Sequence, residues 1–283
     1  MMVTQKDVTK TLEKLGVENG DVLLFHSSLK SFGQTENGAD TVIDGALDAV
    51  GKLGTLIAPT LVQKNFSKAY ETWNKELSPS DVGFISETLR KRKEAYRSDQ
   101  ATHSVAAIGK LAEYITNSHS TSAPRKHPYG DYAFSHGSPW QKMYDLGGKV
   151  VFMGCGMESN TYHHFVEAVF AEEILSLVKE ENKYLLDNLV TFDTRDEHTR
   201  QLKEENNGGP RHTLIRFQFG KSRQKNHAMD IGLYKEAFCG NSKFLIFNIK
   251  EYVDDLLNEV KTHTDEFYTN DVLNLIQTLK NQK

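Results

Sequence analysis

The stretch "DVLLFHSSLKSFGQTENGADTVIDGALDAVGKLGTLIAPTL", residues 21–61, decides the fold class of this chain. It begins with an apolar run at 21–25, continues with a helical pattern at 39–51 and ends with a second apolar run at 54–61, which Pro59 stops. A strand, a helix and a strand in this order predict a sheet covered by helices. We therefore predict an α/β fold, a three-layer α/β/α sandwich around a central sheet that is mostly parallel or mixed.

The same alternation continues on both sides of this stretch. Further helices are predicted at 4–16, 86–95, about 161–178, 247–264 and 270–280, and further strands at 102–109 and 149–154. Residues 195–225 carry eight basic and four acidic side chains, which predict either a solvated hairpin or an arm that contacts substrate. We expect a single domain over residues 1–283, with a motif-bearing core at 1–178 and a variable arm, hairpin and closing helices at 179–283.

Composition and charge exclude several classes of protein. The chain has 283 residues and a formal net charge of −4, so nothing favours nucleic-acid binding. Its two cysteines, Cys155 and Cys239, are far apart, which argues against a disulfide framework and fits a reducing cytosol. No apolar run approaches the about 18 residues of a membrane helix, and the N-terminus lacks a signal peptide. We expect a cytoplasmic protein without membrane partners, either a monomer or a homodimer.

The stretch "GCGMESNTYHHFVEA", residues 154–168, carries the chemistry that we consider first. Asn160 or Thr161 can cap a helix that places His163 and His164 in its first turn. The positive end of the helix dipole disfavours a cationic ring there, and a neutral imidazole is what a general base requires. Glu167 follows at the i+3 and i+4 positions and can reach either ring.

The apolar side chains of this helix distinguish the two histidines. Phe165, Val166, Val169, Phe170 and Ile174 define its buried face. In that projection the first histidine of the pair borders the buried face, and the second points away from it. We therefore predict that the second is the general base, that Glu167 orients it, and that the first packs in the interior.

Two other classes of function compete with this interpretation. A metal-dependent hydrolase could use His163, His164 and Glu167, with further ligands from His26, His103, His119, His127 or His136. None of these histidines stands at a recognised metal-binding spacing, so we expect no metal. A non-catalytic binding module is the other alternative.

Polar residues also follow the predicted strands. "HSSLKSFG", residues 26–33, comes directly after a buried strand, and in open α/β sheets such strand ends line the ligand crevice. The hydroxyl and backbone N–H groups of Ser27 and Ser28 could contact an anion or an amide-bearing cofactor, or they could cap a turn. Thr60 and Ser104 lie at further strand ends. Cys155 is either a nucleophile or a small buried residue.

Together these stretches resemble the aminoglycoside 3-N-acetyltransferase family, also called antibiotic N-acetyltransferases, and in particular its YokD-like branch. The resemblance is carried by four motifs in the family's order, within about residues 10–170: "DVLLFHSSLKSFG", "GADTVIDGALDAVGKLGTLIAPT", "RSDQATHSVAAIG" and "GSPWQKMYDLGGKVVFMGCGMESNTYHHFVEA". It implies acetyl-CoA as the donor and a small-molecule amine, the 3-amino group of an aminoglycoside or a different amine, as the acceptor. The family's signature histidine and glutamate fall on His164 and Glu167. The resemblance also implies a coenzyme channel formed by His26, Ser27, Ser28, Leu29, Thr60 and Ser104.

The sequence departs from the family pattern in two places. Gln100 and Ala101 stand where the family usually has histidine and proline. Known resistance enzymes of the family attract polycationic aminoglycosides with an acidic cleft, whereas residues 195–225 are net basic here. The first departure keeps the binding-module alternative open, and the second favours an amine other than an aminoglycoside.

Overall fold

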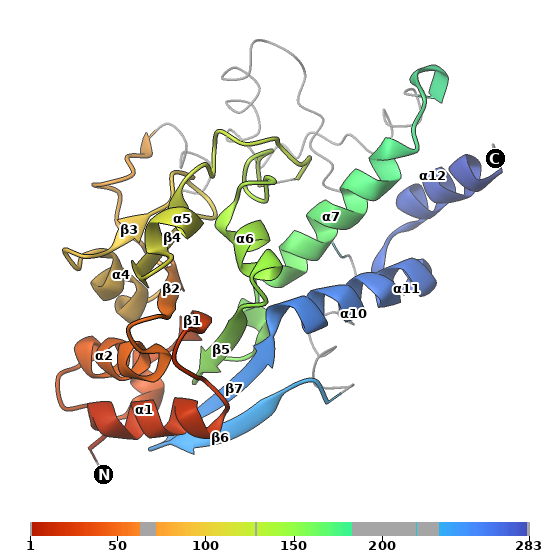
Figure 1. Cartoon of the computed structure of the whole chain (residues 1–283). Helices are drawn as coiled ribbons and strands as arrows, with labels where there is room; N and C mark the ends of the chain where they lie inside the picture. Colours follow the sequence, from red (N-terminus) through yellow and green to blue (C-terminus); the bar gives the residue numbers. More distant parts are fainter. Residues whose placement is uncertain (1, 63–71, 128, 183–218, 220–231, 282–283) are drawn as a thin grey trace.

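A computed structural model of the chain describes residues 2–62, 72–127, 129–182, 219 and 232–281 (Figure 1). The predicted basic arm at 195–225 lies outside these residues, apart from Phe219. Within the described ranges, no helix combines the length and apolar character needed to cross a membrane.

The described strands form one seven-stranded sheet in the order β3-β4-β2-β1-β5-β7-β6. β1 runs parallel to both β2 and β5, and the other neighbouring pairs are antiparallel. The sheet is therefore mixed, and the alternative of a mostly parallel sheet is wrong. The strands are β1 Val22–Ser27, β2 Thr55–Pro59, β3 Tyr96–Arg97, β4 Val105–Gly109, β5 Lys149–Met153, β6 Lys235–Cys239 and β7 Ser242–Asn248.

Helices cover both faces of this sheet, as the three-layer prediction requires. α1 Gln5–Lys14, α2 Ala39–Val50 and α4 Phe84–Arg90 pack on one face, and the remaining helices pack on the other (Figure 1). Alternate residues of each strand serve opposite faces. In β1, for example, Leu23 and Phe25 pack in the core beneath α1, α2 and α4, and Val22 and Leu24 pack in the core on the opposite face.

The second face carries α5 Ala112–Thr116, α6 Pro139–Asp145, α7 Tyr162–Ser176, α10 Ile249–Thr262, α11 Thr264–Phe267 and α12 Asn270–Lys280. Two 3-10 turns, η1 Leu29–Phe32 and η3 Met157–Ser159, follow strands β1 and β5. Several helix starts are fixed locally. At α1, Thr4 and Asp7 form a reciprocal capping box, which satisfies backbone N–H groups that the helix leaves unpaired.

A hairpin was expected within residues 179–283, but the strands β6 and β7 that form one there were not located from the sequence. The sequence pattern favoured a helix from residue 247, but β7 continues to Asn248, whose side chain then caps α10 by accepting a hydrogen bond from the N–H of Glu251 at 3.1 Å. β7 pairs with β5, so the C-terminal part completes the sheet that the N-terminal part begins. The division of the single domain at residue 178 stays a prediction.

The strand directions bring the functional segments to one edge of the sheet. β1, β2 and β5 are mutually parallel, so their carboxyl ends lie together. β4 is antiparallel to β2, and its amino end therefore meets the same edge. The segments after β1, β2 and β5, and the residues just before β4, thus border one crevice.

Candidate active site

The start of α7 presents a histidine and a carboxylate in direct contact. Asn160, one of the two predicted caps, accepts a hydrogen bond from the N–H of Tyr162 at 3.1 Å through its side chain. His164 Nδ1 then lies 2.7 Å from Glu167 Oε2. An ionised carboxylate only accepts hydrogen bonds, so in the neutral form of the ring the proton lies on Nδ1 and Nε2 keeps a lone pair. This arrangement suits an imidazole that accepts a proton at Nε2.

The two adjacent histidines lie in different surroundings. The side chain of His164 is 32% exposed, whereas His163 is buried with its ring 6.1 Å from that of Tyr252. This placement agrees with the helical projection. The catalytic role of His164 stays a prediction.

Glu167 is a buried carboxylate with three hydrogen-bond donors. Its Oε2 accepts from His164 and faces His127 Nε2 at 3.4 Å, and its Oε1 accepts from the backbone N–H of Phe219 at 2.7 Å. Burial alone would raise the pKa of this carboxyl. The electrostatic interaction with His164 and the hydrogen bonds from His127 and His164 outweigh burial and lower the pKa of Glu167 to about 2. The carboxylate is therefore ionised at neutral pH.

The three residues of the alternative metal site, His163, His164 and Glu167, do not come together. Among the described residues, the group whose ligand atoms lie within 4.8 Å of one another is His127, His164 and Glu167, without His163. Its closest pair, His164 and Glu167, is already joined by a 2.7 Å hydrogen bond. The other candidates His26, His103, His119 and His136 are not in the group. The absence of a metal stays a prediction.

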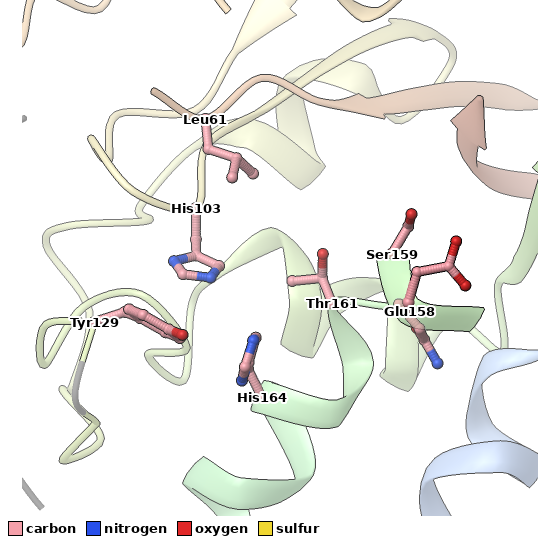
Figure 2. Close-up of a pocket in the computed structure, with 8 residues that line it drawn as sticks. Leu61, His103, Tyr129, Glu158, Ser159, Thr161 and His164 are labelled. Carbon is pink, nitrogen blue, oxygen red and sulfur yellow. The ribbon is translucent and has the colours of Figure 1, made fainter. Parts of the chain in front are cut away.

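Two adjoining cavities open beside this pair. The first, of about 410 Å³, is lined by Leu61, His103, Tyr129, Glu158, Ser159, Asn160, Thr161 and His164. Figure 2 shows the rings of His164 and His103 facing each other across it, with Tyr129 at their side. The second, of about 530 Å³, is lined by His26, Ser27, Pro59, Leu61, Asp81, Val82, Gly83, Ser86, Cys155, Glu158, Ser159 and Thr161. Four residues, Leu61, Glu158, Ser159 and Thr161, line both, so the two cavities form one crevice.

The residues predicted to hold the coenzyme fall into two groups. His26 and Ser27 line the second cavity, and neither His26 Nε2 nor Ser27 Oγ has a hydrogen-bond partner among the described residues. Ser28 and Leu29 do not line either cavity, and the N–H of Ser28 donates to the carbonyl of Met153 at 3.0 Å. Buried polar atoms without partners are uncommon, and the predicted contact of these residues with coenzyme stays a prediction.

Thr60 and Ser104 contact each other and are not among the described residues that line the two cavities. Both are fully buried, and their hydroxyl oxygens lie 3.2 Å apart. Thr60 also accepts hydrogen bonds from the buried guanidinium of Arg97. Burial lowers the pKa of Arg97 to about 10, so it remains charged at neutral pH. The structure thus shows both hydroxyls bonded within the protein interior. Their contact with coenzyme stays a prediction.

Cys155 lines the second cavity but is poorly suited to act as a nucleophile. Burial raises the pKa of its thiol to about 11, and the charge of Glu158 acts in the same direction. A thiol with such a pKa carries very little thiolate at neutral pH. The interpretation as a small packed residue is the one that these surroundings favour.

The residue that departs from the family pattern is part of the site's support. Gln100 is buried, and its side-chain oxygen accepts a hydrogen bond from the N–H of His103. Its amide donates to Thr102 at 3.1 Å, and Thr102 Oγ1 lies 3.0 Å from His103 Nδ1. Gln100 thus helps to position a ring that lines the first cavity.

Sequence reasoning considered His127 only as a possible metal ligand and assigned no role to Tyr129 or Glu158. The first two belong to a loop-rich region more than 30 residues before His164, and no periodicity connects such a loop to a helix. Glu158 lies in the stretch that we quoted, but only η3 determines that its carboxylate borders both cavities.

Comparison with known proteins identifies the family. A family model described as aminoglycoside 3-N-acetyltransferase matches residues 24–258. Aminoglycoside N(3)-acetyltransferase III of Salmonella sp is 33% identical over 184 residues, which cover 59% of this chain and 61% of that protein. Aminoglycoside N(3)-acetyltransferase VII of Streptomyces paromomycinus is 29% identical over 184 residues, with the same two shares. The chain thus spans about 61% of the length of these curated relatives.

Solved structures share the fold over nearly the whole chain. AAC-IIIb, in a binary complex with CoASH, superposes with a TM-score of 0.67 at 19% identity and covers 95% of this chain and 99% of that one. AAC-VIa bound to sisomicin superposes with a TM-score of 0.66 at 18% identity, over 93% and 99%. At this level of identity the superpositions support the fold alone. Because the family model spans most of the sequence, the chain belongs to the aminoglycoside 3-N-acetyltransferase family.

Proposed function

We propose that this protein transfers the acetyl group of acetyl-CoA to an amine, the 3-amino group of an aminoglycoside. The observation that carries the proposal is His164, whose Nδ1 is hydrogen-bonded to a buried carboxylate and whose ring lines an open cavity. Membership of the family supports the same chemistry, as do the names of the curated relatives.

In the proposed reaction, the neutral amine attacks the thioester carbonyl and forms the new C–N bond. His164 Nε2 takes the proton that the nitrogen loses, and Glu167 stabilises the imidazolium. The C–S bond then breaks, and the CoA thiolate leaves and accepts the proton from His164. Because the thiolate is a good leaving group, no protein nucleophile is needed, and transfer is direct within a ternary complex.

The second cavity is the proposed place of the acetyl-bearing end of the coenzyme. His26 and Ser27 line this cavity, and their atoms Nε2 and Oγ are buried without a partner among the described residues. A rotation of the Ser27 side chain would let its hydroxyl reach the amide groups of a pantetheine chain, or the thioester oxygen as it becomes negative. The buried hydroxyls of Thr60 and Ser104 contact each other, next in sequence to Leu61 and His103, which line the crevice.

The charge of the crevice suits a cationic acceptor. The described residues that line the two cavities include the carboxylates of Asp81 and Glu158, and they include neither lysine nor arginine. A polycation such as an aminoglycoside gains electrostatic attraction from this arrangement. A different amine substrate is the alternative within the same reaction, and the net basic residues 195–225 are the sequence feature in its favour. We also propose that the protein works in the cytoplasm.

The test is thiol release from acetyl-CoA by the purified protein, with and without a panel of aminoglycosides. His164→Ala is the test variant, and His136→Ala is the matched control, because His136 contacts a carboxylate of the same helix, Glu172, but does not line either cavity. We expect His164→Ala to lower kcat by about 10²- to 10⁴-fold and to retain acetyl-CoA binding in calorimetry.

Each result has a distinct meaning. Release that requires both an aminoglycoside and His164 supports the proposal, and analysis of the product then fixes the acetylated position. If the protein binds acetyl-CoA but releases no thiol with any aminoglycoside, the acceptor is a different amine. Protein that neither binds nor releases would contradict it.

A further inference from the structure

The proposed mechanism does not use His127, although this residue is the second imidazole on the Glu167 carboxylate. Its Nε2 lies 3.4 Å from Glu167 Oε2, the same oxygen that accepts from His164. The two residues are 40 positions apart in the sequence. The side chain of His127 is 1% exposed and that of Glu167 is 3% exposed, so water does not compete for this contact.

The opposite nitrogen of the ring determines where its proton lies. His127 Nδ1 accepts a hydrogen bond from the backbone N–H of Tyr129 at 3.3 Å. A nitrogen that accepts a hydrogen bond carries no proton, so the proton of the neutral ring is on Nε2 and points at Glu167. Burial lowers the pKa of His127, which keeps the ring neutral and leaves Nε2–H as a donor.

Packing holds the ring in this orientation. The centroid of Phe134 lies 4.8 Å from that of His127 in an edge-to-face arrangement, and the centroid of Tyr129 lies 5.3 Å away. Tyr129 also contacts the ring of His164, at a centroid distance of 4.8 Å. The loop that carries His127 and Tyr129 thus reaches both the carboxylate and the histidine that faces the cavity.

We propose that His127 is a positioning residue for acetyl transfer: its Nε2–H holds the Glu167 carboxylate in the orientation that keeps the proton of His164 on Nδ1. The inference rests on the proposed function for its effect on rate, but its effect on the tautomer does not depend on any acceptor. With Oε1 of Glu167 held by the N–H of Phe219 and Oε2 held by both imidazoles, only Nε2 of His164 is available to accept the proton of the amine. Without His127, Oε2 keeps His164 as its one donor among the described residues, so the carboxylate can turn about its hydrogen bond to Phe219. His164 can then also adopt the Nε2–H tautomer, which cannot act as a base toward the cavity.

The experiment combines two substitutions with two readouts on the full chain. His127→Leu removes the donor at similar volume, and His127→Gln restores an N–H near the place of Nε2. His119→Gln is the control for loss of a buried histidine, since His119 bonds Ser98 and Ala133 and not Glu167. Nitrogen-15 NMR of the imidazoles reports the tautomers of His127 and His164 in the free protein, and steady-state kinetics report kcat and the KM of acetyl-CoA.

We expect His127 to be the Nε2–H tautomer and His164 the Nδ1–H tautomer in the unsubstituted protein. His127→Leu should mix the tautomers of His164 and lower kcat by about 10-fold with little change in the KM of acetyl-CoA. His127→Gln should restore most of both, and His119→Gln should change neither. An Nδ1–H proton on His127, or an unchanged His164 tautomer in His127→Leu, would overturn the inference, and the first observation needs no variant to fold. If the unsubstituted protein acetylates no amine, the proposed function fails, while the NMR result still decides the role of His127.

Discussion

His164 and Glu167 share a 2.7 Å hydrogen bond although one side chain faces a cavity and the other is almost completely buried. The carboxylate therefore keeps its charge away from water, and the imidazole that it orients stays accessible to substrate. A charge in such a low-dielectric setting acts more strongly on its neighbour than the same charge at the surface.

Replacement of Glu167 by glutamine keeps the shape of the side chain and removes its charge. The imidazolium that forms on His164 loses its anionic partner, so kcat should fall by about 10- to 1,000-fold. Glu172→Gln is the matched control, because Glu172 lies on the same helix, is 39% exposed and pairs with Arg125 and His136. A kcat that does not change in Glu167→Gln would show that Glu167 does not act through charge.

Glu158 should contribute to the affinity for a cationic acceptor, because its exposed carboxylate borders both cavities. Glu158→Gln should raise the KM of an aminoglycoside by about 3- to 10-fold, and the effect should shrink as salt is added. The KM of acetyl-CoA should change little. Glu113→Gln provides the control, since Glu113 is exposed on α5 and lines neither cavity. An equal effect of the two substitutions would mean that only the net charge matters.

Cys155 should not carry the acetyl group during turnover. With a pKa of about 11, about one Cys155 thiol in 10,000 is ionised at pH 7. Cys155→Ala should therefore retain most of the activity, and rapid quenching followed by intact-mass measurement should find no acetylated protein. An acetyl adduct on Cys155 that forms and decays at the rate of turnover would contradict direct transfer.

His26 should make folding stability depend on pH. Burial, followed by the charge of His163, lowers the pKa of His26 to about 3. The unfolded chain binds this proton near pH 6.5 and the folded chain does not, so the contribution is present above pH 6.5 and is lost as pH falls toward 3. Between pH 7.5 and pH 5 the unfolding free energy should decrease by about 2 kcal/mol through this residue.

His26→Phe is the variant that tests this contribution, because phenylalanine keeps the stacking on Phe152, whose ring lies 5.1 Å away. Denaturant unfolding at the two pH values should show a smaller loss of stability in the variant than in the unsubstituted protein. Equal losses would mean that His26 is not the group that binds the proton on unfolding.

Several elements could be predicted from the sequence because their signals are local. The helix α12 coincides with its apolar pattern at residues 270–280, and Gly16 follows shortly after the end of α1. The spacing of His164 and Glu167 also sufficed to predict their contact, since residues three apart on a helix lie on one side of it. Periodicity and spacing within about ten residues determine these features.

Only the tertiary structure decided the features that depend on chain segments far apart in sequence. The hairpin of β6 and β7 joins the sheet next to β5, and the antiparallel direction of β4 brings His103 to the crevice. The approach of His127 to Glu167 likewise joins a loop to a helix 40 positions later.

The burial of Thr60 and Ser104 shows the same limit for a predicted site residue, because a strand end can point into a crevice or away from it. By itself, then, the sequence determined the helices α1, α2, α4, α7, α10 and α12, the strands β1, β2, β4 and β5, and the histidine–carboxylate pair, which are properties of neighbouring residues. It did not predict the short helices α5, α6 and α11. The second imidazole, the shape of the crevice and the direction of each strand were decided by packing. Packing depends on the whole set of long-range contacts, and no local pattern encodes that set.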